Sequence, residues 1–349
     1  MKPFQSIQGQ TGPCRLLQAA VDSRRLAHAY LLAGPEGCGR FTMALDLVAC
    51  LVCPEEEAGF CGECPHCRKV FTLNHPDVRV TIPRTASVTP DAEAALLAAR
   101  ASDGVTPLRF PGNTGISIGQ IREIEARLSK KSYEGRGHGE IILDAHLMRR
   151  EAANALLKTL EEPPGHTLIV LTTSFLSGVL PTVRSRCHSV RLGALRPEQI
   201  KSILIRRTGL EPQDAEALAL SCGGSPGRAL AAAAQWEGRH EDRAMEVIRN
   251  LAAIGEPFRL LQYAGGLARE LGREGLLELC CRVVSAAQDL RRSMARGTEP
   301  LVETLPSRVL SDSFLERVQT EFLQCSVRLR GNVSPAMALE AAVLTLGGS

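Results

Sequence analysis

The sequence is poor in aromatic residues and has no long apolar run, and both shortages narrow the kind of protein it encodes. Aromatic residues make up only 4% of the 349 positions, whereas Ala, Leu, Glu and Arg are abundant, so helices should dominate. No apolar stretch approaches the length that spans a bilayer, and the first ten residues lack the apolar segment of a secretory signal. We therefore expect a cytoplasmic protein that has no membrane partner.

The chain also lacks a strong excess of charge of either sign. Its formal net charge of +3 is nearly balanced, so any contact with nucleic acid must come from a local patch or from a complex. Basic and aromatic residues are not interleaved in the manner of surfaces that bind single strands. The length is too great for one ordinary core, and two or three domains are expected.

The most informative stretch in the first part of the chain is Gly34 to Thr42, which reads GPEGCGRFT. An apolar run, Ala29 to Ala33, precedes it and a helical pattern, Met43 to Leu51, follows it, which is the strand, loop and helix order of a phosphate-binding loop. The consensus places a phosphate-neutralising lysine where Arg40 stands and a magnesium-binding hydroxyl where Phe41 stands. Taken alone, the loop is equally consistent with an ordinary glycine-rich turn. The candidate residues of a degenerate nucleotide site are Gly34, Gly37, Gly39 and Arg40.

Four of the twelve cysteines crowd into fifteen positions, with the spacing Cys53-x7-Cys61-x2-Cys64-x2-Cys67. Two overlapping CxxC turns let thiolates converge on one tetrahedral ion, and Cys53 closes the shell. In a reducing compartment this crowding indicates metal binding before disulfides. We predict a structural zinc ion, because four thiolates leave no open position for catalysis. Cys50 also forms a CxxC with Cys53, and we interpret it as a helix residue that faces the core.

A second block begins at Glu140 to Leu143, a short apolar strand that ends in Asp144. An aspartate at the tip of a buried strand opposite a phosphate loop is where P-loop proteins hold nucleotide-bound magnesium, although the alternative for Asp144 alone is a helix N-cap. Residues 83–116, between the cysteines and this block, form an insertion or flexible excursion with a possible short helix, Asp91 to Ala101. A helix with regular apolar spacing is predicted over Ile118 to Ser129.

Together and in this order, these patterns resemble the AAA+ clamp-loader subunits of bacterial DNA polymerase III. The resemblance covers most of the first two hundred residues. It rests on Arg25 to Gly39, the four-cysteine module, Asn74 to Asp77, Ile118 to Gly135, Asn154 to Pro164 (NALLKTLEEPP) and Thr182 to Cys187 (TVRSRC).

The resemblance implies the following domain organisation. An α/β AAA+ P-loop core spans residues 1–192, with a zinc module at about 50–76 and the insertion at about 83–116. A small helical lid domain follows at 193–232. An all-α collar domain, which joins the subunits of the family into a ring, occupies 233–349.

Departures from the family's ATPases favour the type of subunit called delta prime over the ATP-hydrolysing gamma or tau type. Those ATPases carry Asp-Glu at the strand tip, and the glutamate polarises the attacking water, whereas this chain has Asp144-Ala145. Arg40 and Phe41 alter two further functions of the site. The chain is therefore expected to have no ATPase activity of its own and to bind ATP poorly, if at all. Two alternatives remain: an active gamma or tau type ATPase, or a stand-alone zinc-containing DNA-binding protein.

The resemblance assigns a catalytic role to Arg186, in the triplet Ser185-Arg186-Cys187. It implies an arginine finger that enters the ATP site of the neighbouring subunit, where the alternative is a surface arginine in an ion pair. It also implies a nucleotide sensor at Arg228, whereas the hydroxyls at 172–174 are equally well explained as strand-end capping groups. The partners implied are the gamma or tau ATPase and delta subunits of a five-subunit ring, the sliding clamp and primer–template DNA.

Overall fold

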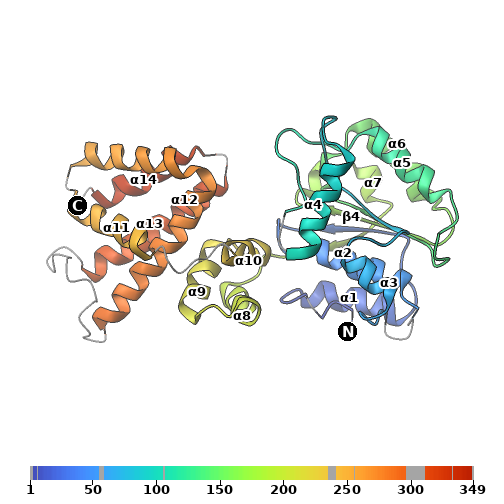
Figure 1. Ribbon diagram of the computed structural model, residues 1–349, viewed down its shortest axis with the longest axis horizontal. Helices are drawn as coiled ribbons and strands as arrows, with labels where there is room; N and C mark the ends of the chain where they lie inside the picture. Colours follow the sequence, from blue (N-terminus) through green and yellow to red (C-terminus); the bar gives the residue numbers. More distant parts are fainter. Residues whose placement is uncertain are drawn as a thin grey trace. The chain divides into compact units, whose positions relative to one another are not determined.

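A computed structural model describes residues 3–5, 7–54, 59–104, 107–234, 241–254, 256–295, 311–331 and 333–347 (Figure 1). The chain divides into two compact units, Met1–Leu195 and Arg196–Ser349. The first is an α/β unit and the second is helical. No helix in the described ranges is long and apolar enough to cross a membrane.

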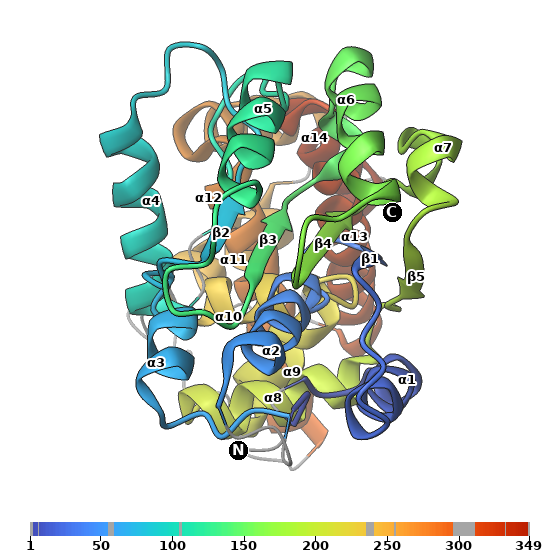
Figure 2. The same ribbon diagram turned by 90° about the vertical axis from the view of Figure 1, so that its right-hand side faces the viewer.

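The first unit is built on a five-stranded sheet in which every pair of neighbouring strands is parallel. Figure 2 shows the strands side by side in the order β2-β3-β4-β1-β5. This confirms the α/β core with a parallel sheet that the sequence predicts. The strands are β1 (Ala29–Ala33), β2 (Val78–Thr81), β3 (His138–Ile142), β4 (Thr167–Thr173) and β5 (His188–Arg191).

Helices cover both faces of this sheet, as a buried parallel sheet requires. In Figure 1, α1 (Thr11–Asp22), α2 (Arg40–Val52) and α3 (Pro65–Phe71) lie below the sheet, and α5 (Ile118–Leu128), α6 (Arg150–Glu161) and α7 (Pro181–Arg184) lie above it. Strand β1 alternates between the two cores: its second and fourth residues pack with α1 and α2, and its first and third pack with α5 and α6. All five residues of β1 are buried, which places the phosphate-type loop at the end of a central strand.

The expected insertion contains one helix, α4 (Pro90–Asp103), which flanks the β2 edge of the sheet (Figure 2). The hydroxyl of Thr89 accepts the backbone N–H of Ala92 at its start, and Gly104 ends it with φ 68°. The predicted short helix is thus confirmed. Two single turns of 3-10 helix, η2 (Ala145–Leu147) and η3 (Leu176–Gly178), follow β3 and β4.

The second unit begins with three short helices, α8 (Pro197–Thr208), α9 (Pro212–Ser221) and α10 (Pro226–Ala234). Four further helices, α11 (Glu241–Ala253), α12 (Pro257–Ala295), α13 (Asp312–Arg330) and α14 (Pro335–Gly347), share one apolar core. Gly272, at φ 61°, interrupts the helical backbone of α12. The division into a lid at 193–232 and a collar at 233–349 stays a prediction.

Candidate functional site

The predicted phosphate-type loop lies where the sequence places it, between β1 and α2. The backbone N–H of Gly34 donates to Thr173 O at 3.0 Å, and a Cβ at Gly34 would lie 2.5 Å from Leu192 O. Gly37 and Gly39 have φ of 74° and 102°, values that side chains disfavour. The three glycines therefore shape a tight turn that leads directly into a helix N-terminus, the geometry of an anion cradle.

Arg40 and Asp144 meet beside this loop. Arg40 is the first residue of α2 and only 8% exposed, and its Nη1 lies 3.5 Å from Asp144 Oδ1. Asp144 occupies the N-cap position of η2, but its side chain makes no capping bond, which argues against the simple cap interpretation. Its backbone N–H donates to the Thr172 hydroxyl at 3.2 Å. The carboxylate expected to hold magnesium thus faces the chain's own arginine.

The insertion at about 83–116 also contacts the phosphate-type loop and the start of α2. The Arg100 guanidinium lies 5.4 Å from the centre of the Phe41 ring, and Arg109 forms a 3.1 Å ion pair with Glu36 inside the loop. Apolar residues of α4 and of the segment after it join the same core, namely Leu96, Leu97, Leu108 and Phe110. Phe41, at the position of the magnesium-binding hydroxyl, is therefore used for packing.

The hydroxyls at the end of β4 accept hydrogen bonds from nearby backbone N–H groups. The Thr173 hydroxyl accepts the backbone N–H of Phe175 at 3.1 Å and lies 3.1 Å from His146 Nδ1. Burial lowers the pKa of His146, so the ring favours its neutral form there. These bonds match the interpretation of the hydroxyls as strand-end capping groups.

Arg186 follows α7 and is held by its own subunit. Its Nε donates to Glu161 Oε1 at 2.7 Å, its Nη2 forms an ion pair with the same carboxylate, and its Nη1 donates to Thr182 O at 3.0 Å. The Arg186 side chain remains 34% exposed. Arg228 lies in α10 of the second unit, where its backbone N–H donates to the Ser225 hydroxyl at 3.2 Å. The roles proposed for both arginines stay predictions.

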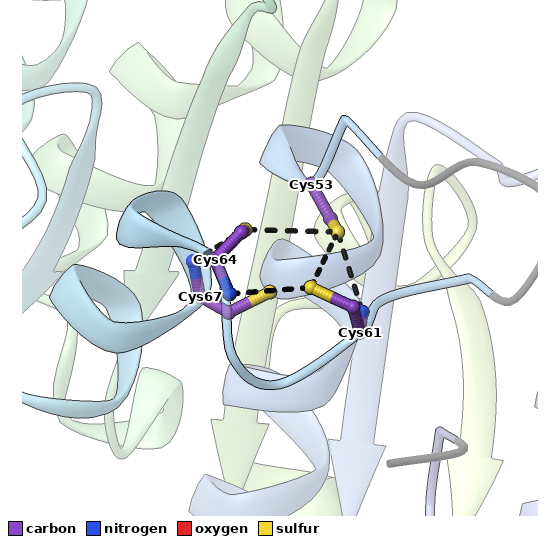
Figure 3. A group of neighbouring side chains, drawn as sticks. All are labelled: Cys53, Cys61, Cys64 and Cys67. Carbon is purple, nitrogen blue, oxygen red and sulfur yellow. Dashed lines mark hydrogen bonds between the residues drawn. The ribbon is translucent and has the colours of Figure 1, made fainter.

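The four predicted cysteines converge, as Figure 3 shows. The sulfur of Cys53 lies 3.8 Å from that of Cys61 and 4.0 Å from that of Cys64, and all four sulfurs lie within 4.8 Å of one another. A tetrahedral ion with Zn–S bonds of about 2.3 Å separates its sulfurs by about 3.8 Å. The cluster can therefore hold a metal ion such as zinc. Cys50 is outside this group and packs against the apolar core, as predicted.

Backbone N–H groups support these sulfurs. Cys61 N donates to Cys53 Sγ and Cys64 N donates to Cys61 Sγ, both at 3.3 Å, and Cys67 N donates to Cys64 Sγ at 3.4 Å. Hydrogen bonds, first that from the backbone of Glu63, lower the pKa of Cys61 to about 7, whereas burial raises that of Cys67. Such N–H···S bonds stabilise thiolates, the form that binds a metal.

A cluster that sequence reasoning missed joins the cysteine module to the segment before β3. Glu134 Oε2 lies 2.5 Å from His66 Nδ1 and 3.1 Å from His75 Nε2, and Glu134 Oε1 accepts a hydrogen bond from Lys69 Nζ at 2.5 Å. The backbone N–H of Asp77 donates to His75 Nδ1 at 3.1 Å, so the proton of a neutral ring sits on Nε2 and points at Glu134. The ligand atoms of His66, His75 and Glu134 lie within 4.8 Å of one another, a spacing that could hold a metal ion. His66 and His75 lie close to the cysteine pattern in the sequence, but no local pattern links them to Glu134.

Comparison with known proteins finds relatives of the first unit. Residues 9–196 match the family model described as DNA polymerase III, delta subunit. The chain is 32% identical over 193 residues to DNA polymerase III subunit delta' of Bacillus subtilis, covering 55% of this chain and 50% of that protein. It is 36% identical over 206 residues to subunit delta' of Pseudomonas aeruginosa, covering 57% and 54%.

Proteins of the gamma/tau type are also similar. DNA polymerase III subunit gamma/tau of Mycobacterium tuberculosis is 30% identical over 204 residues, covering 58% of this chain and 31% of that protein. The aligned part spans about half the length of the delta' relatives. Among solved structures, a Thermotoga maritima RuvB variant is 15% identical, covering 88% of this chain and 89% of its own, with a TM-score of 0.45.

Proposed function

Because the chain belongs to the DNA polymerase III delta subunit family and is of the delta prime type, we propose that it is a subunit of the clamp loader that does not hydrolyse ATP. The Arg40–Asp144 pair carries this proposal. In a working site the strand-tip aspartate binds magnesium and the loop lysine binds the outer phosphates. Here the two positions engage each other, so neither group is available without breaking an ion pair.

Two further positions support the loss of hydrolysis. Ala145 is buried and has no group that orients an attacking water. Phe41 packs against the insertion and supplies no magnesium ligand. An active gamma or tau type ATPase would require all of these positions to act differently, which makes it the weaker alternative.

Two contributions are proposed for this subunit: it helps to assemble the ring, and it supplies a catalytic group to the ATP site of a neighbouring subunit. It adopts an AAA+ arrangement, joins a five-subunit ring with gamma or tau and delta subunits, and places Arg186 beside the ATP of the neighbour. There a fixed cation stabilises the charge that develops on the transferred phosphoryl group. The ring then opens a sliding clamp and loads it onto primed DNA. A structural zinc ion on Cys53, Cys61, Cys64 and Cys67 stabilises the cysteine module.

The test is reconstitution of the complete loader with Arg186→Ala in this chain. Loss of an arginine finger slows the site it serves by about 10³-fold or more, so the DNA-stimulated ATPase of the complex should fall while assembly persists. Arg184→Ala, an exposed arginine two residues earlier, is the matched control and should leave the rate unchanged. Unchanged ATPase with Arg186→Ala would overturn the finger. ATP turnover by the isolated chain, lost in Asp144→Ala, would overturn the non-hydrolysing role.

A further inference from the structure

The guanidinium of Arg186 meets Glu161 along one of its edges. Nε and Nη2 form the edge that meets Glu161, and Nη1 donates to Thr182 O at 3.0 Å and to Ser185 Oγ at 3.4 Å. A guanidinium carries five N–H groups in one plane. The edge that points away from the side chain, with one N–H from each Nη nitrogen, is not the edge bound to Glu161. That end-on edge suits the two oxygens of a phosphate.

The elements on either side of this pair are packed together. Glu161 is the last residue of α6, and Thr182 lies in α7. Leu160 and Val183, their respective neighbours, are both buried in the same apolar core. The backbone segments that carry the Glu161 carboxylate and the Thr182 carbonyl are therefore both anchored in this core.

An ion pair this exposed contributes little to folding. The side chains of Arg186 and Glu161 are 34% and 49% exposed, and such pairs are screened by solvent. Stability is therefore a poor explanation for a carboxylate that takes two bonds from one arginine. Orientation is a better one, because a long side chain that is already ordered loses less freedom when it meets a ligand.

We propose that Glu161 is a positioning residue, which holds the guanidinium of Arg186 so that its end-on edge faces outward to the phosphate of a neighbouring subunit's nucleotide. This inference rests on the proposed role of Arg186. The carboxylate and the phosphate engage different edges, so both are bound at the same time. Glu161 touches neither the nucleotide nor the reacting atoms and acts only through Arg186.

The experiment is a double-mutant cycle in the reconstituted loader with Glu161→Ala, Arg186→Ala and both together. Glu161→Ala should lower kcat of the DNA-stimulated ATPase about tenfold, within the effect that small misplacements produce, and leave the KM for ATP unchanged. In the Arg186→Ala background the same change should have no further effect. Glu161→Gln, which keeps one acceptor oxygen, should recover part of the rate.

The matched control is Glu162→Ala, the adjacent exposed carboxylate, whose side chain has no hydrogen bond or ion pair within the described ranges. It should behave as the unaltered chain, and thermal melting should show that all variants are folded. If Arg186→Ala slows the complex and Glu161→Ala does not, or speeds it, the positioning role is wrong and the proposed function stands. An equal loss in both backgrounds would mean that Glu161 acts on structure. If Arg186→Ala itself has no effect, the proposed function fails.

Discussion

Arg40 Nη1 lies 3.5 Å from Asp144 Oδ1, and this ion pair joins the start of α2 to a residue that lies two positions after the end of β3. The two partners differ in burial: the Arg40 side chain is 9% exposed and that of Asp144 is 29% exposed. The arginine has therefore given up most of its hydration, and the aspartate is its compensating charge. The same pair that argues against magnesium binding also contributes to the stability of the core.

Removing the carboxylate should therefore destabilise the fold. Asp144→Asn keeps the side-chain volume but leaves Arg40 without its counter-charge, and we expect the free energy of unfolding to fall by about 1–3 kcal/mol. Urea unfolding followed by circular dichroism measures the change. Glu162→Gln removes an exposed carboxylate of the same unit and should change stability by less than about 0.5 kcal/mol. Equal stability of the two variants would contradict a structural role for the pair.

The cysteine cluster predicts a metal content and a response to its removal. Protein prepared without chelator should contain about one zinc ion per chain, and substitution by cobalt should give the spectrum of a tetrahedral thiolate site. Chelation should lower the melting temperature, because four close thiolates then lack a compensating cation. Cys61→Ser should weaken metal retention, whereas Cys50→Ser should not, because Cys50 packs outside the cluster. Less than about half an ion per chain would argue against a closed site.

Local signals in the sequence predict much of the fold and the metal ligands. The bounds of β1, Ala29 to Ala33, agree with those of the apolar run. All five residues of this strand are buried, so its sequence is continuously apolar and does not alternate between apolar and polar residues. The four cysteines were found from spacing alone, since tight turns fix where their sulfurs lie. The helix over 118–129 follows its apolar period.

Other features depend on contacts that no local pattern encodes. The strand β3 begins at His138, and a Cβ at Gly139 would lie 3.1 Å from Val48 of α2. The close approach of the Val48 side chain favours glycine at this position of the strand. The Arg40–Asp144 pair joins residues 104 positions apart, so only the folded sheet brings them together. Strand β5 was missed because only one of its four residues is buried.

Asp46 predicts a dependence of stability on pH. It lies in α2, is 3% exposed, and accepts the backbone N–H of Phe4 at 2.8 Å. Burial raises the pKa of Asp46 from 3.8 to about 7. The folded state therefore holds a proton that the unfolded chain releases between these values, so this stabilising contribution is complete below pH 3.8 and is lost as pH rises to 7.

The loss amounts to roughly 2–4 kcal/mol over that interval. Asp46→Asn should remove this pH dependence and raise the free energy of unfolding at pH 8, because a neutral amide still accepts the bond from Phe4. Denaturant unfolding from pH 4 to pH 8 measures both effects. Asp91→Asn, an exposed position in α4, is the control and should leave the pH profile unchanged. A parallel profile for Asp46→Asn would show that the carboxyl is ionised in the folded protein.

Glu140 gives the sharpest prediction for stability, because its side chain in β3 is fully buried. It forms an ion pair with Arg127 of α5 and accepts a hydrogen bond from the Thr81 hydroxyl at 2.7 Å. Burial lowers the pKa of Arg127 to about 10, so it remains a cation at neutral pH. Arg127→Met should therefore lower the free energy of unfolding by about 3–5 kcal/mol, since it leaves a buried carboxylate without its partner.

Replacing both members should recover most of that loss. In Arg127→Met with Glu140→Met neither charge remains buried, and a well-packed apolar pair is often as stable as the ion pair it replaces. Equilibrium unfolding of the two single variants and the double variant gives the coupling between the positions. Arg122→Met, on an exposed position of the same helix, controls for the loss of an arginine from α5. A double variant less stable than Arg127→Met alone would mean that Glu140 is held chiefly by Thr81 and its other neighbours.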